Sequence, residues 1–332
     1  MQEGPEGDKV PNGTRAEHRN GAAIDRNIAA TYDTALAEYD YLARPLWDTV
    51  RDRVAECRRL RGDTDPEVIH ALRVTLRRLK ALQWVYRPRL PATQGDAERD
   101  ATRILRRAAG SVRDWDVALA LAEHWLPRAQ KTRTVLTTVR ADAAVFGVSR
   151  LAEHVAQLSE MPSVAAEAVT SHVPEAMASA VSVDLDFLAA RLKTAQKQLR
   201  KRGKRAARKG AEAYAALHEV RKAGKRVRDV HALMVGFTHS QVTRAASTHR
   251  AWKRARKMDR WASRLLGKDQ RKRLQRVQSR FGALNDVVHS ATLLQDTAER
   301  SRRFAQTRGV RRLIRTLDQV AEGYRRRAIA LL

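Results

Sequence analysis

The sequence predicts an all-α protein built from two related halves. Alanine, leucine, arginine and valine dominate the 332 residues, and the chain holds only 16 glycines, 9 prolines and 5% aromatic residues. This balance favours helices over strands. Apolar residues also recur at helical spacing along most of the chain. A pattern rich in histidine and arginine occurs twice, which indicates an internal repeat.

The first half is assigned to residues 28–165 and follows a polar tail. Residues 1–27 are predicted to be disordered, because they are polar and have no apolar core. A long amphipathic helix is predicted over 30–61, and Gly62 ends it. The apolar residues that define the buried face of this helix are Leu36, Tyr39, Leu42, Leu46, Val50 and Val54.

A second helix is predicted to begin after Asp65 and to run to about Tyr86. The order Asp65, Pro66, Glu67 is typical of a helix N-terminus. Aspartate caps free backbone N–H groups, and proline is tolerated at the first helical position. The helix should stop before Pro88, because proline cannot continue it.

The rest of the first half is predicted to contain shorter helices separated by Gly110. A helix over 96–109 would end at this glycine. Ser111 and Asp114 have the spacing of a capping box, which predicts a new helix to about Leu126. One or two further helices are expected over 131–158.

The second half is assigned to residues 175–332, after a predicted hinge over 162–174. A polar break is expected at 236–240, and the sequence contains no convincing strand. The predicted helices of this half are 181–209, 212–235, 244–281, 285–302 and 310–331.

The charge of the chain points to a polyanionic partner. There are 65 Lys and Arg residues against 37 Asp and Glu, a net charge of +28. Residues 191–280 hold 29 of these cations and 5 of the acids, so they carry +24 of the total. A neutral small substrate does not require such an excess, whereas nucleic acid, polyphosphate or an anionic membrane surface does.

Other features of the sequence limit the class of protein. Cys57 is the only cysteine, which excludes a disulfide within the chain and a cysteine-based metal site. No apolar run reaches 18 residues, and the N-terminus lacks the apolar core of a signal peptide. We therefore expect a soluble cytoplasmic protein without a membrane span.

The internal repeat consists of two blocks in each half. Residues 70–80 match 218–228 at a spacing of 148, and residues 110–114 match 282–286 at a spacing of 172. The second half therefore holds 172 − 148 = 24 additional residues between its blocks. They fall within a basic insertion near 236–268.

The first block of each half places cations on one side of a helix. At roughly 100° per residue, His70, Arg73, Arg77 and Lys80 form one stripe, and leucines occupy the opposite face. The second copy has the same stripe, formed by His218, Arg221, Lys225 and Arg228. We expect the two stripes to face a shared groove without compensating carboxylates. Repulsion between the cations would then be relieved by a bound row of phosphates.

The two blocks of the first half resemble the sequence motifs of a known family. His70, Arg73, Val74, Arg77, Arg78, Leu79 and Lys80, followed by Gly110 to Val117, are similar to the motifs of the CHAD domain, the conserved histidine α-helical domain. The resemblance spans about 30–331. It implies two pseudo-symmetric four-helix bundles around a basic central channel, and binding of inorganic polyphosphate, in some members on polyphosphate granules.

The resemblance implies that the motif residues line this channel. Basic residues from the helices before each glycine block would support them. The candidate polyphosphate-binding residues are His70, Arg73, Arg77, Arg78, Lys80, Arg103, Arg106, Arg107, His218, Arg221, Lys222, Lys225, Arg226, Arg228, Lys272, Arg273, Arg276 and Arg280. A phosphate near the two histidines would favour protonated imidazoles, so we expect tighter binding at about pH 6 than at about pH 8.

The second half departs from the family pattern. It has Asn285, Asp286 and Val287 where the first half has Arg113, Asp114 and Trp115, and it carries the basic insertion. The Glu-x-Glu-x-Lys motif of the triphosphate-tunnel enzymes that accompany some CHAD domains is absent. We expect Asp114 to cap a helix or to pair with an arginine.

Two other functions remain open. A nucleic-acid-binding protein would also explain the charge, and Trp252 and Trp261 lie among basic residues that would allow bases to stack. A polyphosphate or triphosphate hydrolase would need an acidic metal-binding cluster, which we do not find. The sequence therefore predicts a non-enzymatic protein with no catalytic residues, no metal and no cofactor. The oligomeric state is left open.

Overall fold

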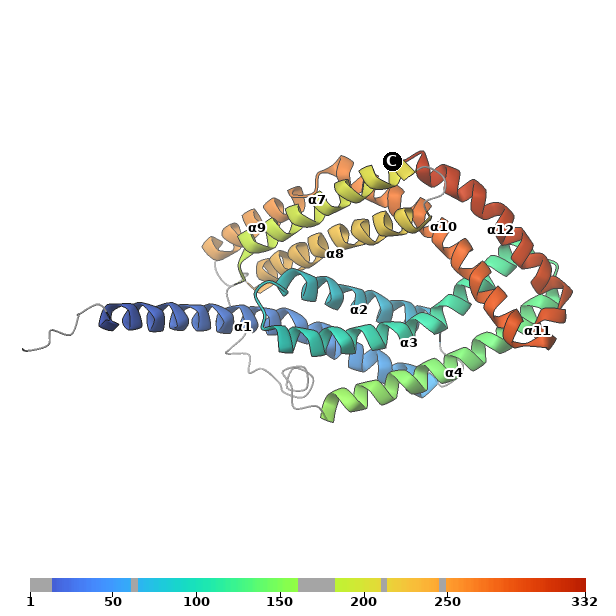
Figure 1. The fold of residues 1–332 in the computed structure, drawn as a ribbon, viewed down its shortest axis with the longest axis horizontal. Helices are drawn as coiled ribbons and strands as arrows, with labels where there is room; N and C mark the ends of the chain where they lie inside the picture. The colour runs from blue at the N-terminus through green and yellow to red at the C-terminus, as the bar shows by residue number, and fades with distance from the viewer. Residues whose placement is uncertain (1–13, 61–64, 161–182, 210–213, 245–248) are drawn as a thin grey trace, which may run out of the picture.

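The chain forms ten α-helices over the residues that the structure describes (Figure 1). The structure is a computed structural model that describes residues 14–60, 65–160, 183–209, 214–244 and 249–332. No strand occurs in these ranges, so the all-α prediction is confirmed. The predicted hinge over 162–174 lies outside them.

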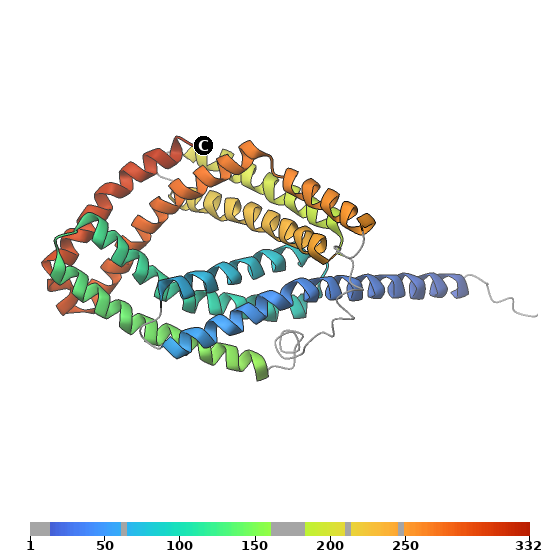
Figure 2. The same cartoon turned by 180° about the vertical axis from the view of Figure 1, so that it is seen from behind.

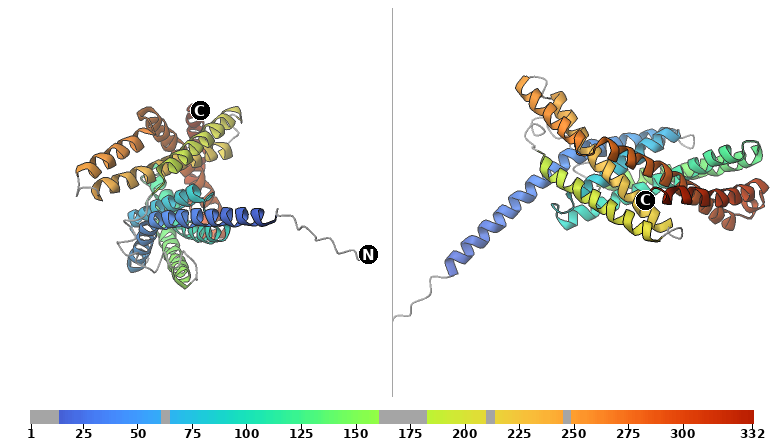
Figure 3. Two further views of the ribbon diagram at one scale, coloured as in Figure 1. Left: turned by 90° about the vertical axis from the view of Figure 1, so that its left-hand side faces the viewer. Right: turned by 90° about the horizontal axis from the view of Figure 1, so that it is seen from above.

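Helix α1 (Thr14–Leu60) begins earlier than the sequence suggested. Residues 14–27 are helical, so the prediction that they are disordered is wrong. Residues 1–13 lie outside the described residues. Extending an existing helix avoids the cost of nucleating a new one, and no proline interrupts this segment. Figure 3 shows the N-terminal part of α1 projecting from the rest of the molecule.

Helix α2 (Pro66–Tyr86) has the boundaries that its flanking residues predicted. The carboxylate of Asp65 accepts a hydrogen bond of 2.8 Å from the backbone N–H of Glu67, and Pro66 occupies the first turn. The cap fixes the start of the helix and thereby the direction in which its motif residues point.

Helix α3 (Ala92–Trp125) is continuous, so the predicted break at Gly110 is wrong. A Cβ atom at Gly110 would lie 3.4 Å from Nη1 of Arg73, so the glycine leaves room for that side chain instead of ending the helix. The side chain of Ser111 donates to the carbonyl of Ala108 at 2.8 Å, which is a bond within a continuing helix. Helix α4 (Gln130–Glu160) is likewise a single helix.

Helices of the second half also continue through the breaks that the sequence predicted. Helix α7 (Leu185–Lys209) precedes α8 (Tyr214–Arg244), which passes through the predicted break at 236–240. The break is absent because Thr238 is buried, and its hydroxyl bonds to the carbonyl of Val235 and to Asp259, each at 3.1 Å. Helix α10 (Lys268–Arg300) runs through the second glycine block in the same way as α3. The remaining helices are α9 (His249–Arg264), α11 (Arg302–Gln306) and α12 (Arg308–Ile329).

The helices pack in the same order in both halves (Figures 1 and 2). Helices α1, α2, α3 and α4 pack each on the next, and α4 returns to α1. In the second half α7 packs on α8, α8 on α10 and α10 on α12. Within the predicted insertion, residues 236–244 form the last turns of α8, and residues 249–264 form the additional helix α9, which packs on α8.

The halves share their largest apolar cores. One core joins residues such as Leu79 and Leu105 of the first half to Leu192, Val227 and Val230 of the second. At the other end of the molecule, α3 and α4 pack with α10, α11 and α12 around a second shared core. Smaller clusters that belong to one half each lie beside these cores. The two halves are therefore joined at both ends.

Candidate anion-binding site

Helices α2 and α8 pack against each other and turn their basic faces towards the junction of the two halves. Their apolar faces are buried on the opposite side, as the helical spacing predicted: Leu72, Leu76 and Leu79 are fully buried, and Val220 and Val227 nearly so. Burial of these aliphatic groups fixes each helix in rotation, and so fixes the direction of its cations.

Six cations from both halves lie within electrostatic reach of one another, and we call them the central cation cluster. They are Arg73, Arg77 and Lys80 of α2, Arg106 of α3, and Arg221 and Lys225 of α8. Each was predicted from the sequence as a candidate. Cations from three helices, two of the first half and one of the second, therefore lie close together.

Burial and mutual repulsion lower the pKa values of this cluster. Burial lowers the pKa of Lys225 to about 7, helped by the charges of Arg221, Arg77 and Arg73. The pKa of Lys80 falls to about 8, again mainly by burial and then by the nearby Arg106. Such shifts show that these charges are costly without an anionic partner.

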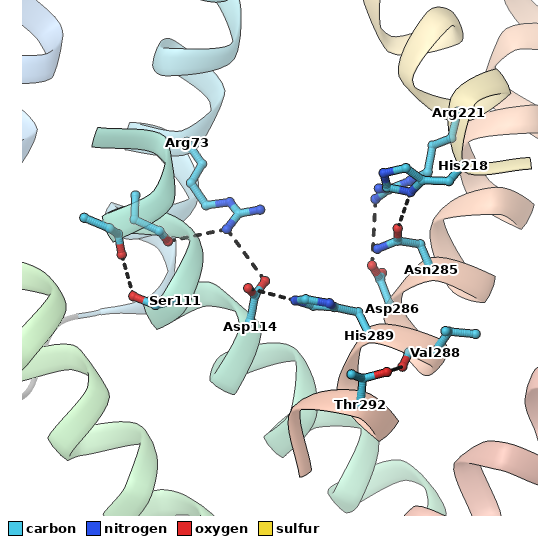
Figure 4. A network of polar contacts seen from close by, with 12 residues as sticks. Arg73, Ser111, Asp114, His218, Arg221, Asn285, Asp286, Val288, His289 and Thr292 are labelled. Carbon is cyan, nitrogen blue, oxygen red and sulfur yellow. Dashed lines mark hydrogen bonds and ion pairs between the residues drawn. The ribbon is translucent and has the colours of Figure 1, made fainter. Parts of the chain in front are cut away.

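Three carboxylates form ion pairs with cations of the cluster, which corrects the expectation of a groove without acid. Asp114 lies 3.8 Å from Arg73, and Asp286 lies 3.8 Å from Arg221. Figure 4 shows the two arginines extending towards each other from α2 and α8, with the carboxylates below them. The pairs occupy matching positions of the two repeat blocks. The expectation that Asp114 pairs with an arginine is confirmed.

The third carboxylate makes the site asymmetric. Asp229 of α8 accepts from Nε of Arg77 at 3.0 Å, and it is almost completely buried. The repeat-related positions of Arg77 and Asp229 are 225 and 81. These are Lys225 and an alanine, so the equivalent ion pair cannot form. Among the residues the structure describes, Lys80, Arg106 and Lys225 form no ion pair. Three of the six cations of the cluster thus have an ion-pairing carboxylate in the described part of the chain, and three do not.

The arginines keep free hydrogen-bonding capacity. The 3.8 Å contacts of Arg73 and Arg221 with their carboxylates are longer than a hydrogen bond. Arg73 also donates weakly, at 3.4 Å, to the carbonyl of Ala109. Nε of Arg221 is buried and has no hydrogen-bond partner in the described part of the chain. Guanidinium groups held in this way can still bind phosphate oxygens in a bidentate manner.

The motif histidines have different environments. His70 is exposed, whereas Nδ1 of His218 lies 2.9 Å from Oδ1 of Asn285. Burial, followed by the charge of Lys222, lowers the pKa of His218. Neither histidine contacts the carboxylates of the cluster in the structure.

One histidine was missed by the sequence reasoning. Nε2 of His289 on α10 lies 2.9 Å from Asp114 on α3, so it joins the two halves beneath the arginines (Figure 4). This contact raises the pKa of His289. Its place three residues after Asp286, on the same face of a helix, was the only signal that the sequence offered.

Several predicted site residues lie at the margin of the cluster or face a different neighbour. Lys222 is exposed and pairs with Glu219 at 2.9 Å, although its charge reaches Lys80. Arg226 turns towards α7, where it bonds to Gln198 at 2.9 Å. Arg228 contacts Asp229 and Gln278 instead of the other cations.

The remaining predicted residues stay apart from the cluster and are exposed. They are Arg78, Arg103, Arg107, Lys272, Arg273, Arg276 and Arg280. Arg103 pairs with Asp100, and Arg280 donates to the carbonyl of Arg327. The position in α10 that matches Arg106 is Gln278, which donates to the carbonyl of Gly224 at 3.4 Å. Helix α3 therefore supplies a cation to the cluster where α10 supplies an amide.

None of the His, Cys, Asp and Glu side chains of the described residues gather in groups of three or more suited to a metal ion. None of the helices in the described ranges is long and apolar enough to span a membrane.

The fold and the site define an all-α protein in which two halves place a group of mutually repelling cations at their junction. The family model of the CHAD domain matches residues 45–295. This chain belongs to the CHAD domain family. The crystal structure of the CHAD domain from the plant Ricinus communis is similar in fold, with a TM-score of 0.55 and 21% identity. That similarity covers 87% of this chain and 85% of the other. No curated protein matches the chain.

Proposed function

We propose that this protein binds inorganic polyphosphate at the central cation cluster, without turnover. One observation carries the proposal: six cations from both halves converge, and only three of them form ion pairs with carboxylates of the described residues. A chain of phosphates supplies repeated negative charge along its length, which suits cations contributed by three different helices.

The proposal extends to the biological role. By holding polyphosphate without cleaving it, this protein would store polyphosphate, or it would itself be directed to polyphosphate granules in the cytoplasm. Release of phosphate from long chains, with magnesium or manganese added, would contradict the absence of turnover. It would favour the hydrolase alternative instead.

The test uses cations that have no carboxylate partner. The triple variant Lys80→Gln, Arg106→Gln and Lys225→Gln removes three charges without leaving a buried acid unpaired. We expect polyphosphate binding to be lost, while the melting temperature stays the same or rises because repulsion is relieved. Binding is measured by titration calorimetry with polyphosphate of defined length, and folding by circular dichroism.

A matched control removes the same charge elsewhere. The variant Arg78→Gln, Arg107→Gln and Arg276→Gln changes three exposed cations that lie outside the cluster. We expect it to bind almost as well as the unaltered protein. If both triple variants lose equal affinity, binding depends on overall charge alone and the assignment to the cluster fails.

Nucleic acid is the second candidate, favoured by one feature of α9. This helix exposes seven cations, together with the half-exposed indole of Trp261. Competition between long-chain polyphosphate and single-stranded DNA or RNA at matched salt separates the two ligands. We expect polyphosphate to displace nucleic acid. The reverse result would favour the second candidate.

A further inference from the structure

A cavity of about 430 Å³ lies in the second half, between α7, α8, α10 and the last residues of the chain. Its walls are mainly aliphatic. The residues that form most of them are Leu199, Val220, Val227, Leu274, Val277 and Leu332. The volume falls within the range of about 300–1,000 Å³ that is typical of small-molecule sites.

The repeat explains why this half has the cavity. The α8 positions 220, 224 and 227 correspond to Leu72, Leu76 and Leu79 of α2, which are fully buried leucines. Two of the three are valine in α8, and the third is Gly224. A Cβ atom at Gly224 would lie 3.7 Å from Leu274 and 3.9 Å from Val277, two wall residues of the cavity. At these positions the second half therefore has less aliphatic side-chain volume than the first half, where leucines fill the space.

Cations surround the apolar walls of this cavity. Arg200 and Lys204 of α7 and Arg273 of α10 line it, and all three are exposed. No aspartate or glutamate side chain lines the cavity, and within the described ranges none of these three cations forms an ion pair. Two glutamines, Gln196 and Gln270, supply further polar groups. An apolar interior with unpaired cations beside it is complementary to an amphiphilic anion.

We propose that this cavity is a binding site for a long-chain carboxylate, whose alkyl chain lies against the aliphatic walls and whose head group meets Arg200, Lys204 and Arg273. The site is separate from the central cation cluster, because none of the cluster residues lines the cavity. Helix α8 contributes to both, through cations on one face and valines on another.

The first test fills the cavity. A Cβ atom at Gly203, which lines the cavity on α7, meets nothing within 4 Å, so Gly203→Leu places a side chain there without a backbone clash. Titration calorimetry with decanoate should show binding to the unaltered protein and none to this variant. Gly236→Leu is the matched control, because Gly236 is also helical and unobstructed but does not line the cavity. It should bind decanoate normally.

The second test removes the cations. Arg200→Gln with Lys204→Gln should weaken decanoate binding by roughly tenfold or more, since hydrogen bonds to charged groups are lost. Binding of the neutral analogue decanol should not change. The triple variant of the central cation cluster should bind decanoate as the unaltered protein does. The proposal is overturned if the unaltered protein ignores decanoate, if Gly203→Leu binds it, or if the charge variant affects both ligands equally.

Discussion

Asp114 and Asp286 orient the arginines of the cluster without saturating them. Each carboxylate lies 3.8 Å from its arginine, beyond hydrogen-bonding distance, and each comes from the second block of its repeat. A guanidinium group has five N–H donors, so both arginines retain donors for a ligand. The two sequence blocks therefore act together: the first supplies the cation and the second supplies the acid that directs it.

Within the described residues, Arg77 has an ion-pairing carboxylate and Lys225 has none, because the two halves differ at one neighbouring position. The acid that pairs with Arg77 is Asp229, and the residue at the matching position of the first half is Ala81. The charges that act most strongly on Lys225 are consequently those of Arg221, Arg77 and Arg73, and Asp286 offsets them only in part. Its pKa of about 7 follows from this environment and from burial.

This pKa predicts how binding depends on pH. Near pH 8.5 the Lys225 amine is largely neutral, and near pH 6 it is largely protonated. Lys225 should therefore take up a proton when the polyanion binds, and binding should tighten as pH falls. Lys80, with a pKa of about 8, acts in the same direction. We expect Lys225→Arg, which stays charged throughout, to flatten the profile.

The measurement is titration calorimetry of long-chain polyphosphate at constant salt across this pH range. Buffers of different ionisation enthalpy would report the proton taken up. Lys80 accounts for pH dependence that remains in the variant, because its pKa of about 8 lies within this range. Identical profiles for both proteins would remove Lys225 from the site.

Gly110 gives a second prediction at the scale of single residues. Its missing side chain leaves space for the Arg73 guanidinium, whereas the matching Gly282 faces open space. Gly110→Leu should displace Arg73 and weaken polyphosphate binding, but destabilise the fold little because the end of an arginine side chain can move. Gly282→Leu should have a smaller effect on affinity, measured in the same titration. Equal effects would contradict this role of Gly110.

At the scale of elements, α9 distinguishes the second half from the first. It packs on α8, with Ala255 and Ala262 buried, and it directs seven cations into solvent. Its one acid, Asp259, is engaged by Thr238. Trp252 lies between His249 and Arg256, with the guanidinium carbon 4.6 Å from the ring centre.

We expect α9 to contribute to affinity for nucleic acid more than for polyphosphate. Exposed charges are screened over about 8 Å at physiological salt, and the α9 cations lie outside the central cluster. Lys253→Gln with Arg254→Gln and Lys257→Gln should leave polyphosphate affinity at 0.15 M salt nearly unchanged and should weaken binding of single-stranded DNA. A large loss of polyphosphate affinity would extend the site onto α9.

At the scale of the whole molecule, the shared cores fix the spacing of the site. The first shared core includes Leu79 of α2 and Val227 and Val230 of α8, and so fixes both helices, while the second core closes the other end of the molecule. Cations that repel one another are held together because apolar burial on the far faces of their helices outweighs the repulsion.

The shared cores predict that both halves unfold together. Leu79→Ala should cost about 2–5 kcal/mol, the usual range for a fully buried leucine, and the loss should appear in both halves at once. Circular dichroism and tryptophan fluorescence should follow a single denaturant transition. Two separate transitions would show that the halves are independent domains.

The sequence alone determined that the chain is helical and which side of each of the two motif helices is basic. Helical spacing, the Asp65–Pro66 start and the two repeated blocks were sufficient for this, because these signals depend on neighbours within a few turns. All six residues of the central cation cluster were among the candidates for the same reason. The glycines at 110 and 282 misled the prediction, because a helix stop and a close side-chain approach both favour glycine.

Only the tertiary structure decided which candidates meet and which acids join them. The separation of Arg106 from its neighbours Arg103 and Arg107, the Arg77–Asp229 pair and the place of His289 all depend on contacts between helices distant in sequence. The pKa values of Lys80 and Lys225 depend on burial, which arises only when those helices pack. Local patterns specify the faces of helices, and long-range packing selects the residues that those faces bring together.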